Sequence, residues 1–183
     1  MPDNEKFDIK ALLAQDSDPE EEARLQKYKE EMGVVGEGGG TISQLTLTLE
    51  VEGDRPSQTW HLDSPETLAE IKTKAFVLAE GCHYRIVIGF RVDGSKSVLG
   101  LKCTSNTYRK GVRVLKDARK LGSFPARKAP HSVSLPPHGW EEAPTGLLSH
   151  GHYDVKSAFH DGDNTLLAEF EYAFDIKAGW PDA

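Results

Sequence analysis

Apolar and polar residues alternate with a period of two along four stretches of the chain, residues 45–51, 82–92, 153–159 and 166–176. Alternation of this kind is typical of strands that bury one face. Turn signals separate the stretches: Gly53-Asp54, Asp93-Gly94, Lys110-Gly111, Pro136-Pro137 and Asp161-Gly162-Asp163. No long helical pattern lies between them, so the chain is predicted to be all-β, an antiparallel β-sandwich rather than a parallel α/β sheet.

The first 32 residues follow a helical period instead and predict two short helices joined by a turn. Apolar residues share one face of each helix: Ile9, Leu12 and Leu13 in the first, and Leu25, Tyr28 and Met32 in the second. Asp18 and Pro19 favour the start of the second helix and Gly33 its end. Neither helix is long enough to be stable alone in water, so each apolar stripe needs a partner. We therefore expect a flexible arm over residues 1–36, a Gly-rich linker over 37–40 and the sandwich over 41–183.

Charge is concentrated in the arm. Residues 1–37 contain 11 of the 29 acidic residues and 5 of the 22 Lys and Arg, so they carry −6 of the formal net charge of −7. The nearly neutral remainder excludes a globally basic nucleic-acid binder. No apolar run approaches the length of a membrane span, and the N-terminus lacks the features of a secretory signal, so we expect a cytoplasmic protein. Cys82 and Cys103 are then expected to be free thiols, with a disulfide as the alternative.

Nothing in the sequence makes a positive case for catalysis, a cofactor or a metal. The seven His residues include His150 and His152 on one strand face, but no HExxH or CxxC spacing accompanies them. There is no GxSxG motif, and the glycines of residues 36–40 lack the Lys-Ser/Thr of a phosphate-binding loop. We therefore predict a non-enzymatic protein.

Two features leave alternatives open. A basic stretch is either a solvated strand face and turn or a contact for a lipid headgroup or an acidic partner; it contains Arg109, Lys110, Arg113, Lys116, Arg119 and Lys120.

Most aromatic residues share the inward-facing set of positions, which is typical of a plain core. Two sheets that splay apart could instead hold a long apolar ligand between them. Periodicity cannot separate a filled core from a pocket.

A set of short segments matches one known family in order and spacing. The segments are residues 25–30 (LQKYKE), 76–81 (FVLAEG), 84–86 (YRI), 90–92 (FRV), 107–112 (TYRKGV), 141–148 (EEAPTGLL) and 151–159, with Tyr153 and Lys156-Ser157. On these segments the chain resembles the Rho GDP-dissociation inhibitor family over residues 6–180. Several linked motifs in one order are far more specific than any single one.

The resemblance implies an immunoglobulin-like sandwich with an N-terminal helix-turn-helix regulatory arm. Such proteins bind prenylated Rho-family GTPases, preferentially in the GDP-bound state, inhibit GDP release and extract the GTPase from membranes into the cytosol. Their sandwich takes the geranylgeranyl chain between its sheets. Positions that match the prenyl pocket are Phe76, Tyr84, Val98, Val155, Phe170 and Tyr172, with Leu47 added. Positions that match GTPase contacts are Glu22 and Tyr28 in the arm, Asp163 in a loop, and Glu141 and Glu142, an acidic patch suited to a basic tail.

The chain departs from the family pattern at points that concern lipid length and partner choice. The family usually carries two Trp where Phe170 and Tyr172 stand, and the arm is shorter than in vertebrate members. We expect a monomer that forms a 1:1 heterodimer with the GTPase and does not insert stably into the membrane. The alternatives are a general shuttle for prenylated or acylated proteins that ignores the GTPase switches, and an adhesion or scaffold module without lipid dependence.

Overall fold

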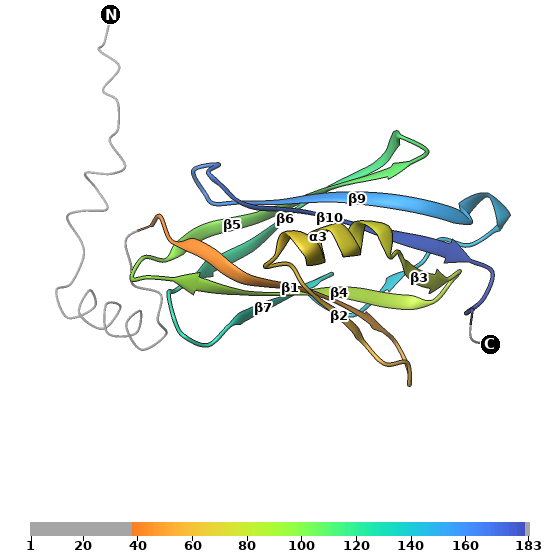
Figure 1. Cartoon of the computed structure of the whole chain (residues 1–183), viewed down its shortest axis with the longest axis horizontal. Helices are drawn as coiled ribbons and strands as arrows, with labels where there is room; N and C mark the ends of the chain where they lie inside the picture. The colour runs from red at the N-terminus through yellow and green to blue at the C-terminus, as the bar shows by residue number, and fades with distance from the viewer. Residues whose placement is uncertain (1–37, 182–183) are drawn as a thin grey trace, which may run out of the picture. The chain divides into compact units, whose positions relative to one another are not determined.

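The structure, a computed structural model, describes residues 38–181 (Figure 1). The predicted arm, with Glu22 and Tyr28, lies outside the described residues. No helix of the described part is long and apolar enough to cross a membrane.

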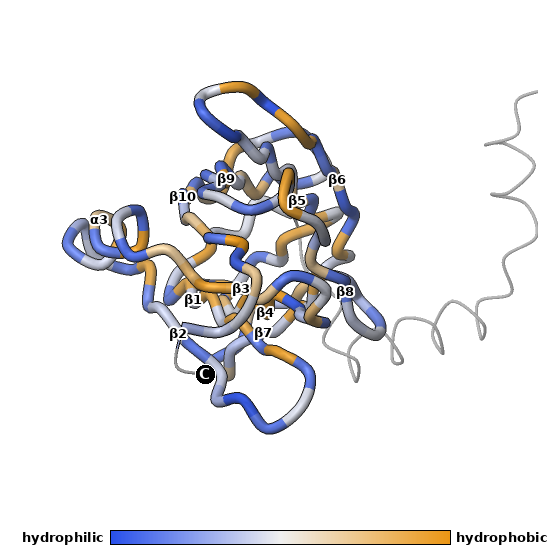
Figure 2. The backbone as a smooth tube through the Cα atoms, turned by 90° about the vertical axis from the view of Figure 1, so that its right-hand side faces the viewer, coloured by the Kyte–Doolittle hydropathy of each residue, from blue (hydrophilic) through white to orange (hydrophobic). Residues whose placement is uncertain are grey.

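Two five-stranded sheets form the two layers of a sandwich (Figure 2). The first sheet has the order β2–β1–β4–β7, with β8 also paired to β4. Its strands are β1 (Thr41–Val51), β2 (Gln58–His61), β4 (His83–Asp93), β7 (His131–Leu135) and β8 (Glu141–Glu142). The second sheet has the order β3–β10–β9–β5–β6. Its strands are β3 (Phe76–Ala79), β5 (Val98–Arg109), β6 (Val112–Phe124), β9 (Gly151–His160) and β10 (Leu166–Lys177).

The predicted sandwich is confirmed. The four alternating stretches form β1, β4, β9 and β10, and all five turn signals lie outside strand interiors, at or beyond strand ends. The named strands pair antiparallel, except that β3 runs parallel to β10. Lys110 and Gly111 both have positive φ, 50° and 78°, which is the two-residue turn that matches the twist of a β-hairpin. The basic stretch that contains them forms the β5–β6 hairpin.

The sequence pattern does not predict the helix α3 (Pro65–Thr73), although its start carries ordinary signals. The Ser64 hydroxyl accepts a hydrogen bond from the Thr67 backbone N–H at 3.2 Å, and Pro65 occupies the first turn. The helix packs against β10 with Ile71 fully buried, and Lys72 forms an ion pair with Glu171 of β10 at 2.5 Å. A nine-residue helix with one buried residue has little amphipathic pattern to detect, because most of its stability comes from this contact.

Inward-facing side chains of both sheets build one core. The largest fully buried ones include Phe76, Phe90, Phe159, Leu47 and Leu101. Cys82 and Cys103 are free thiols, as the sequence favoured. Burial raises the pKa of the Cys103 thiol to about 11, so it is protonated and packs as a small apolar group.

Candidate functional site

A cavity of about 370 Å³ lies between the sheets, within the range of about 300–1,000 Å³ typical of small-molecule sites. One wall comes from the first sheet: Leu49, Tyr84, Ile86 and Leu135. The other wall comes from the second sheet: Phe76, Leu78, Ser105, Thr107, Tyr153, Val155, Tyr172, Phe174 and Ile176. Residues of β6 and β8, on the edges of the two sheets, line its mouth: Val114, Leu115, Asp117, Arg119, Glu141 and Glu142.

The sheets part here because the first sheet loses its edge strand. β7 pairs with β4 only from Ile86 to Phe90 and ends at Leu135, where Pro136 and Pro137 follow. Proline lacks the N–H that a ladder needs, so the strand cannot continue. Only the two-residue strand β8 covers the start of β4 beyond that point. An apolar surface therefore stays open between β6 and β8.

Paired aromatic rings form much of the wall on the second sheet. Tyr153 and Phe174 stack with ring centroids 5.0 Å apart, and Phe76 meets Tyr172 edge to face at 6.2 Å. The Tyr153 hydroxyl donates to the Ser149 carbonyl at 2.7 Å, which ties the wall to the turn outside it. These contacts hold the rings in fixed positions, so the cavity has a defined apolar shape before any ligand enters.

The polar groups inside the cavity are neutral. Burial raises the pKa of both the Tyr84 and the Tyr172 phenol well above the ordinary value of 10, and the Glu141 carboxylate adds to the rise at Tyr84. Neither hydroxyl has a hydrogen-bond partner among residues 38–181. The hydroxyls of Ser105 and Ser157 bond each other at 2.8 Å. The interior suits an uncharged, mostly apolar ligand.

Charged groups gather at the mouth instead. Arg119 of β6 donates through Nε to the Asp117 carboxylate at 2.5 Å and lies 3.8 Å from the Glu141 carboxylate of β8. The hydrogen bond to Asp117 raises the pKa of the Arg119 guanidinium above its usual range. Arg119 thus links the two sheets across the opening, and Glu141 and Glu142 make its β8 side acidic.

The predicted pocket residues divide into two groups. Phe76, Tyr84, Val155 and Tyr172 line the cavity. The other three are buried in the adjoining core without lining it: Leu47, Val98 and Phe170. Phe170 still touches the wall, because its ring stacks on Tyr172 with centroids 6.3 Å apart.

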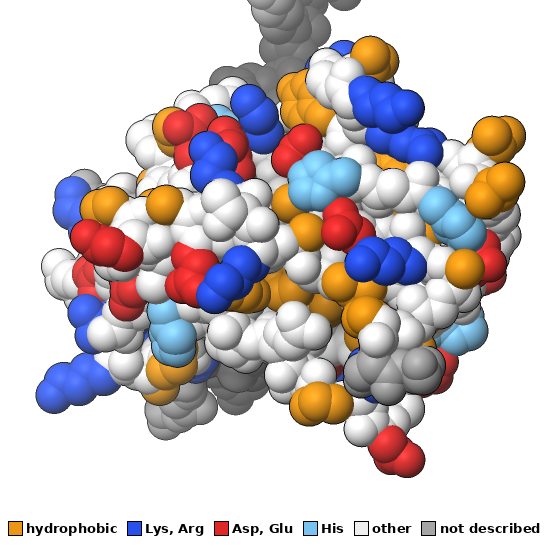
Figure 3. All heavy atoms as spheres, turned by 45° about the vertical axis from the view of Figure 1, so that its right-hand side comes forward, with side chains coloured by type: hydrophobic (Ala, Val, Ile, Leu, Met, Phe, Trp, Pro, Cys, Tyr) orange, Lys and Arg blue, Asp and Glu red, His pale blue; other side chains and the backbone are white. Residues whose placement is uncertain are grey.

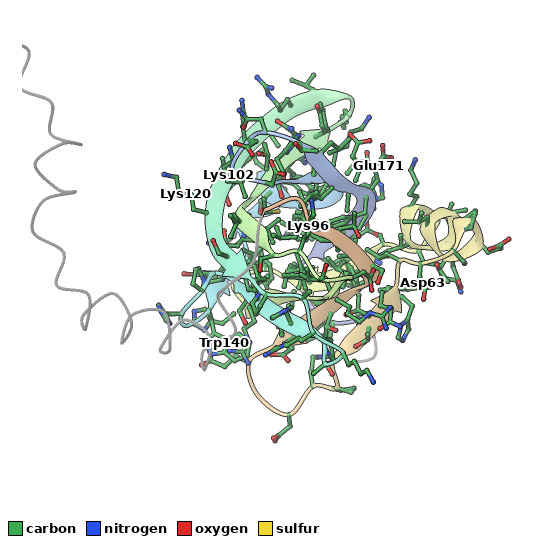
Figure 4. The ribbon with its side chains drawn as sticks, turned by 90° about the vertical axis from the view of Figure 1, so that its left-hand side faces the viewer. Asp63, Lys96, Lys102, Lys120, Trp140 and Glu171 are labelled. Carbon is green, nitrogen blue, oxygen red and sulfur yellow. The ribbon has the colours of Figure 1, made fainter. Side chains whose placement is uncertain are left out.

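The predicted GTPase contacts of the described part lie at opposite ends of the sandwich. Glu141 and Glu142 are at the mouth, whereas Asp163 is exposed in the loop after β9, whose ten residues span about 30 Å. The Asp161 carboxylate fixes that loop by accepting from the Asp163 and Thr165 backbone N–H groups, both at 2.9 Å. Figure 4 looks onto this end, with Lys102 and Lys120 on the paired strands β5 and β6.

The first described residues lie at the same end as Asp163. Gly38 bridges to Ser97, just before β5, and a Cβ at Gly38 would lie 3.1 Å from the Leu99 side chain. The Leu99 carbonyl in turn accepts from the Gly162 N–H in the Asp163 loop at 2.8 Å. The point where residues 1–37 join the sandwich and the Asp163 loop are therefore neighbours.

Sequence reasoning missed part of the lining. Tyr153 and Phe174 belong to the inward-facing aromatic set, for which a filled core and a pocket were both left open, and neither was among the predicted pocket residues; Arg119 was only one cation in a basic stretch. The alternation could supply the direction of these side chains. Their role depends on where the edges of the two sheets separate, which the alternation does not encode. Within the described residues, no group of three or more His, Cys, Asp or Glu is placed to hold a metal ion.

Fold and cavity together define the class of protein: an immunoglobulin-like β-sandwich that opens at one end into an apolar cavity of ligand size. The chain belongs to the RHO protein GDP dissociation inhibitor family, whose model matches residues 3–179. This confirms the resemblance found in the sequence.

Similar proteins cover most of the chain. A candidate rho GDP-dissociation inhibitor 1 of Dictyostelium discoideum is 42% identical over 168 residues, 89% of this chain and 84% of that protein. Rho GDP-dissociation inhibitor 1 of Bos taurus is 37% identical over 175 residues, covering 92% of this chain and 81% of its own. The Rho GDP-dissociation inhibitor of Schizosaccharomyces pombe is 30% identical over 182 residues, which cover 96% of this chain and 85% of that protein.

Proposed function

We propose that this chain binds a prenylated Rho-type GTPase through two separate contacts, the prenyl chain in the cavity and the folded GTPase at the opposite end of the sandwich. Members of the family are regulatory inhibitors that bind Rho-type GTPases, and this chain is one of them. The proposal adds where each part of the partner is held. It also adds the outcome: a 1:1 complex that leaves the membrane for the cytosol with its GDP retained.

The lipid contact is argued from the cavity. A prenyl chain gains about 0.8 kcal/mol for each methylene buried in a bilayer, so moving roughly 20 carbons into water costs on the order of 10 kcal/mol or more. Leu49, Ile86, Val155 and the rings of Tyr172 and Phe174 offer an alternative apolar environment. Burial there offsets most of the cost, which allows the lipidated GTPase to leave the bilayer.

The acidic side of the mouth suits the peptide that precedes the lipid. Glu141 and Glu142 attract a basic C-terminal tail and orient it toward the opening. The mouth and Asp163 are separated by about the length of β9, roughly 30 Å, which about ten extended residues span. A flexible GTPase tail of that length connects the two contacts.

The arm supplies the inhibitory contact in this proposal. Residues 1–36 join the sandwich beside the Asp163 loop, so Glu22, Tyr28 and Asp163 are available to the same GTPase surface. Lipid capture raises the effective concentration of the arm near the GTPase switch regions. Ordering short helices that gain a partner only on binding costs conformational entropy at that step. Once the arm lies on the switch regions, the GTPase retains its GDP.

The observation that carries the proposal is an apolar cavity that opens beside an acidic edge, in a chain of this family. The test is extraction from vesicles that carry a prenylated Rho-type GTPase in its GDP state. We expect the full chain to move the GTPase into the supernatant, and to bind the same GTPase without its prenyl group far more weakly. Equal affinity for the prenylated and unprenylated forms would remove the lipid from the mechanism.

Nucleotide release distinguishes an inhibitor from a general lipid shuttle. We expect the double variant Glu22→Arg with Tyr28→Ala to retain lipid-dependent binding but to lose most inhibition of GDP release. Asp163→Arg should weaken the protein–protein contact in the same assay. If both variants inhibit GDP release as well as the native chain, the sandwich acts as a shuttle and the arm has no switch contact.

A further inference from the structure

Two leucines project from the surface next to the cavity mouth. Leu147 and Leu148, in the 3-10 turn η1 (Leu147–Ser149), are 82% and 89% exposed, more than any other large hydrophobic residue of the described part. Single exposed leucines are ordinary on protein surfaces, but a contiguous apolar patch marks an interaction site. The surroundings of this turn therefore decide its meaning.

The η1 turn is held rigidly in the position that exposes Leu147 and Leu148. Arg109 donates through Nη1 to the Leu148 carbonyl and through Nη2 to the His150 carbonyl at 2.6 Å. The Tyr153 hydroxyl donates to the carbonyl of Ser149, the last residue of the turn, and the Glu80 carboxylate accepts from the Gly146 N–H at 2.7 Å. The exposed leucines are thus presented by a fixed scaffold.

More exposed aliphatic side chains lie on the neighbouring β5–β6 hairpin. On β6, Val112, Val114 and Leu115 are 67%, 53% and 56% exposed, and the latter two also line the cavity. Because Arg109 ends β5 and bonds the leucine turn, the hairpin and the turn lie together at one end of the sandwich (Figure 1). Exposed aliphatic side chains therefore lie both at the cavity mouth and on the turn beside it.

Three cations accompany these side chains. Lys110, Arg113 and Lys116 of the β5–β6 hairpin are exposed, and none has an acidic partner within residues 38–181. Asp117, the nearest acidic residue in sequence, is engaged by Arg119. Figure 3 shows Lys and Arg side chains next to hydrophobic ones over the upper right of this end. We call these side chains the docking rim; they are Lys110, Val112, Arg113, Val114, Leu115, Lys116, Leu147 and Leu148.

We propose that the docking rim rests on an anionic phospholipid bilayer, with Leu147 and Leu148 in the headgroup layer and the cations on the lipid phosphates. Projecting aliphatic side chains flanked by exposed Lys and Arg are the combination that binds anionic membrane interfaces. An acidic protein surface would pair with the cations, but it would leave the projecting side chains of Leu147 and Leu148 without a complementary apolar pocket. The inference rests on the proposed function, because it turns the β6 side of the cavity mouth, and not its acidic β8 side, toward the membrane so that the prenyl chain crosses little water.

The test measures binding of the full chain, without GTPase, to phosphatidylcholine vesicles with and without phosphatidylserine. We expect binding that depends on phosphatidylserine and weakens with salt. Leu147→Ser with Leu148→Ser should lower vesicle affinity by about tenfold or more, the equivalent of losing partial burial of two leucines. Arg113→Glu with Lys116→Glu should lower it by a similar factor or more, since each cation near such a surface contributes about fivefold.

Matched controls lie away from the rim. Leu99→Ser with Leu166→Ser removes two leucines that are 40% and 48% exposed at the opposite end of the sandwich. Lys128→Glu reverses an exposed charge outside the rim. Both control proteins should bind vesicles as the native chain does. Binding of a prenylated peptide in solution should be the same in rim variants and native chain, which also shows that the variants fold.

Three results would overturn the inference. The first is that the rim variants bind anionic vesicles like the native chain, and the second is that native binding does not depend on phosphatidylserine. The third is that polyglutamate displaces the native chain and the Leu147→Ser with Leu148→Ser variant from vesicles equally well. The last would identify an acidic protein surface as the partner. A native chain that binds vesicles through the rim but takes up no prenylated peptide would refute the proposed function and leave the rim intact.

Discussion

The space between the two sheets is filled at one end and hollow at the other, although the same strands build both halves. In the filled half, Phe90 meets Phe124 and Phe159 with ring centroids 5.1 and 6.0 Å apart, and Phe159 meets Phe170 at 5.9 Å. In the hollow half, the tyrosines of β4, β9 and β10 border a cavity of about 370 Å³. Inward-facing residues alternate equally well in both halves, so alternation is not what separates them.

The difference lies in how the sheet edges meet. At the filled end, His131 of β7 bonds the Pro125 carbonyl, just after β6, at 2.8 Å, and Arg127 donates its N–H to the Val92 carbonyl of β4 at 3.3 Å. These bonds close one sheet onto the other. At the hollow end, the contact between β6 and β8 is the longer ion pair of Arg119 with Glu141, at 3.8 Å. A core closes where the edges are joined and stays open where they are not.

The largest expected effect is on the filled half. Phe159 is fully buried among Phe90 and Phe170, so Phe159→Ala leaves a void in a close-packed region. We expect the free energy of unfolding to fall by about 3–5 kcal/mol, measured by urea denaturation. A loss below about 1 kcal/mol would mean that this half is loosely packed, and the contrast between the halves would disappear.

A matched pair of valines tests the contrast more sharply. Val98 and Val155 are 1% and 2% exposed, both were predicted as pocket residues, and only Val155 lines the cavity. Val98→Phe should overpack the filled half and cost about 1–3 kcal/mol of stability. Val155→Phe should place its ring in the hollow, cost less than about 1 kcal/mol, and lower the affinity for a prenylated peptide by about tenfold or more.

The measurements for this pair are urea unfolding and peptide titration in parallel. Equal destabilisation by both substitutions would show that the cavity does not accept added volume. Undiminished peptide affinity of the Val155→Phe protein would place the lipid elsewhere.

Much of this fold could be predicted from the sequence because one face of each long strand is buried. The alternation located β1, β4, β9 and β10, and the Lys110-Gly111 turn located the basic hairpin. α3 was missed, since a short helix held by its contact with β10 leaves little periodic signal. Of the strands that decide where the sandwich opens, β7 alternates over only five residues and β8, with two residues, is too short to show a period.

The candidate site divides in the same way. Phe76, Tyr84, Val155 and Tyr172 came from the resemblance, and the structure brings all four to one cavity. Tyr153 and Arg119 were not predicted to border it, because this depends on how the two sheets face each other: both line the cavity with Tyr84 of the first sheet, and Arg119 lies 3.8 Å from the Glu141 carboxylate of β8. Residue type and direction are local properties, whereas an opening between two edges belongs to the assembled sandwich.

The smallest expected effect comes from one hydroxyl group. The Tyr172 hydroxyl has no hydrogen-bond partner among residues 38–181, so a lipid that displaces water from the cavity leaves it unsatisfied, at a cost of about 1–3 kcal/mol. Tyr172→Phe should therefore tighten prenylated-peptide binding by about fivefold or more. Since burial raises the pKa of this phenol, it stays neutral and the gain should not vary between neutral and mildly alkaline pH.

The control for this hydroxyl is the neighbouring tyrosine of the same wall. Tyr153→Phe removes a hydroxyl that donates to the Ser149 carbonyl at 2.7 Å, so it should cost about 1 kcal/mol of stability without tightening peptide binding. Isothermal titration with both variants checks the pair. Weaker peptide binding by the Tyr172→Phe protein would mean that the hydroxyl bonds the ligand, and the hollow half would then recognise a polar group as well as an apolar chain.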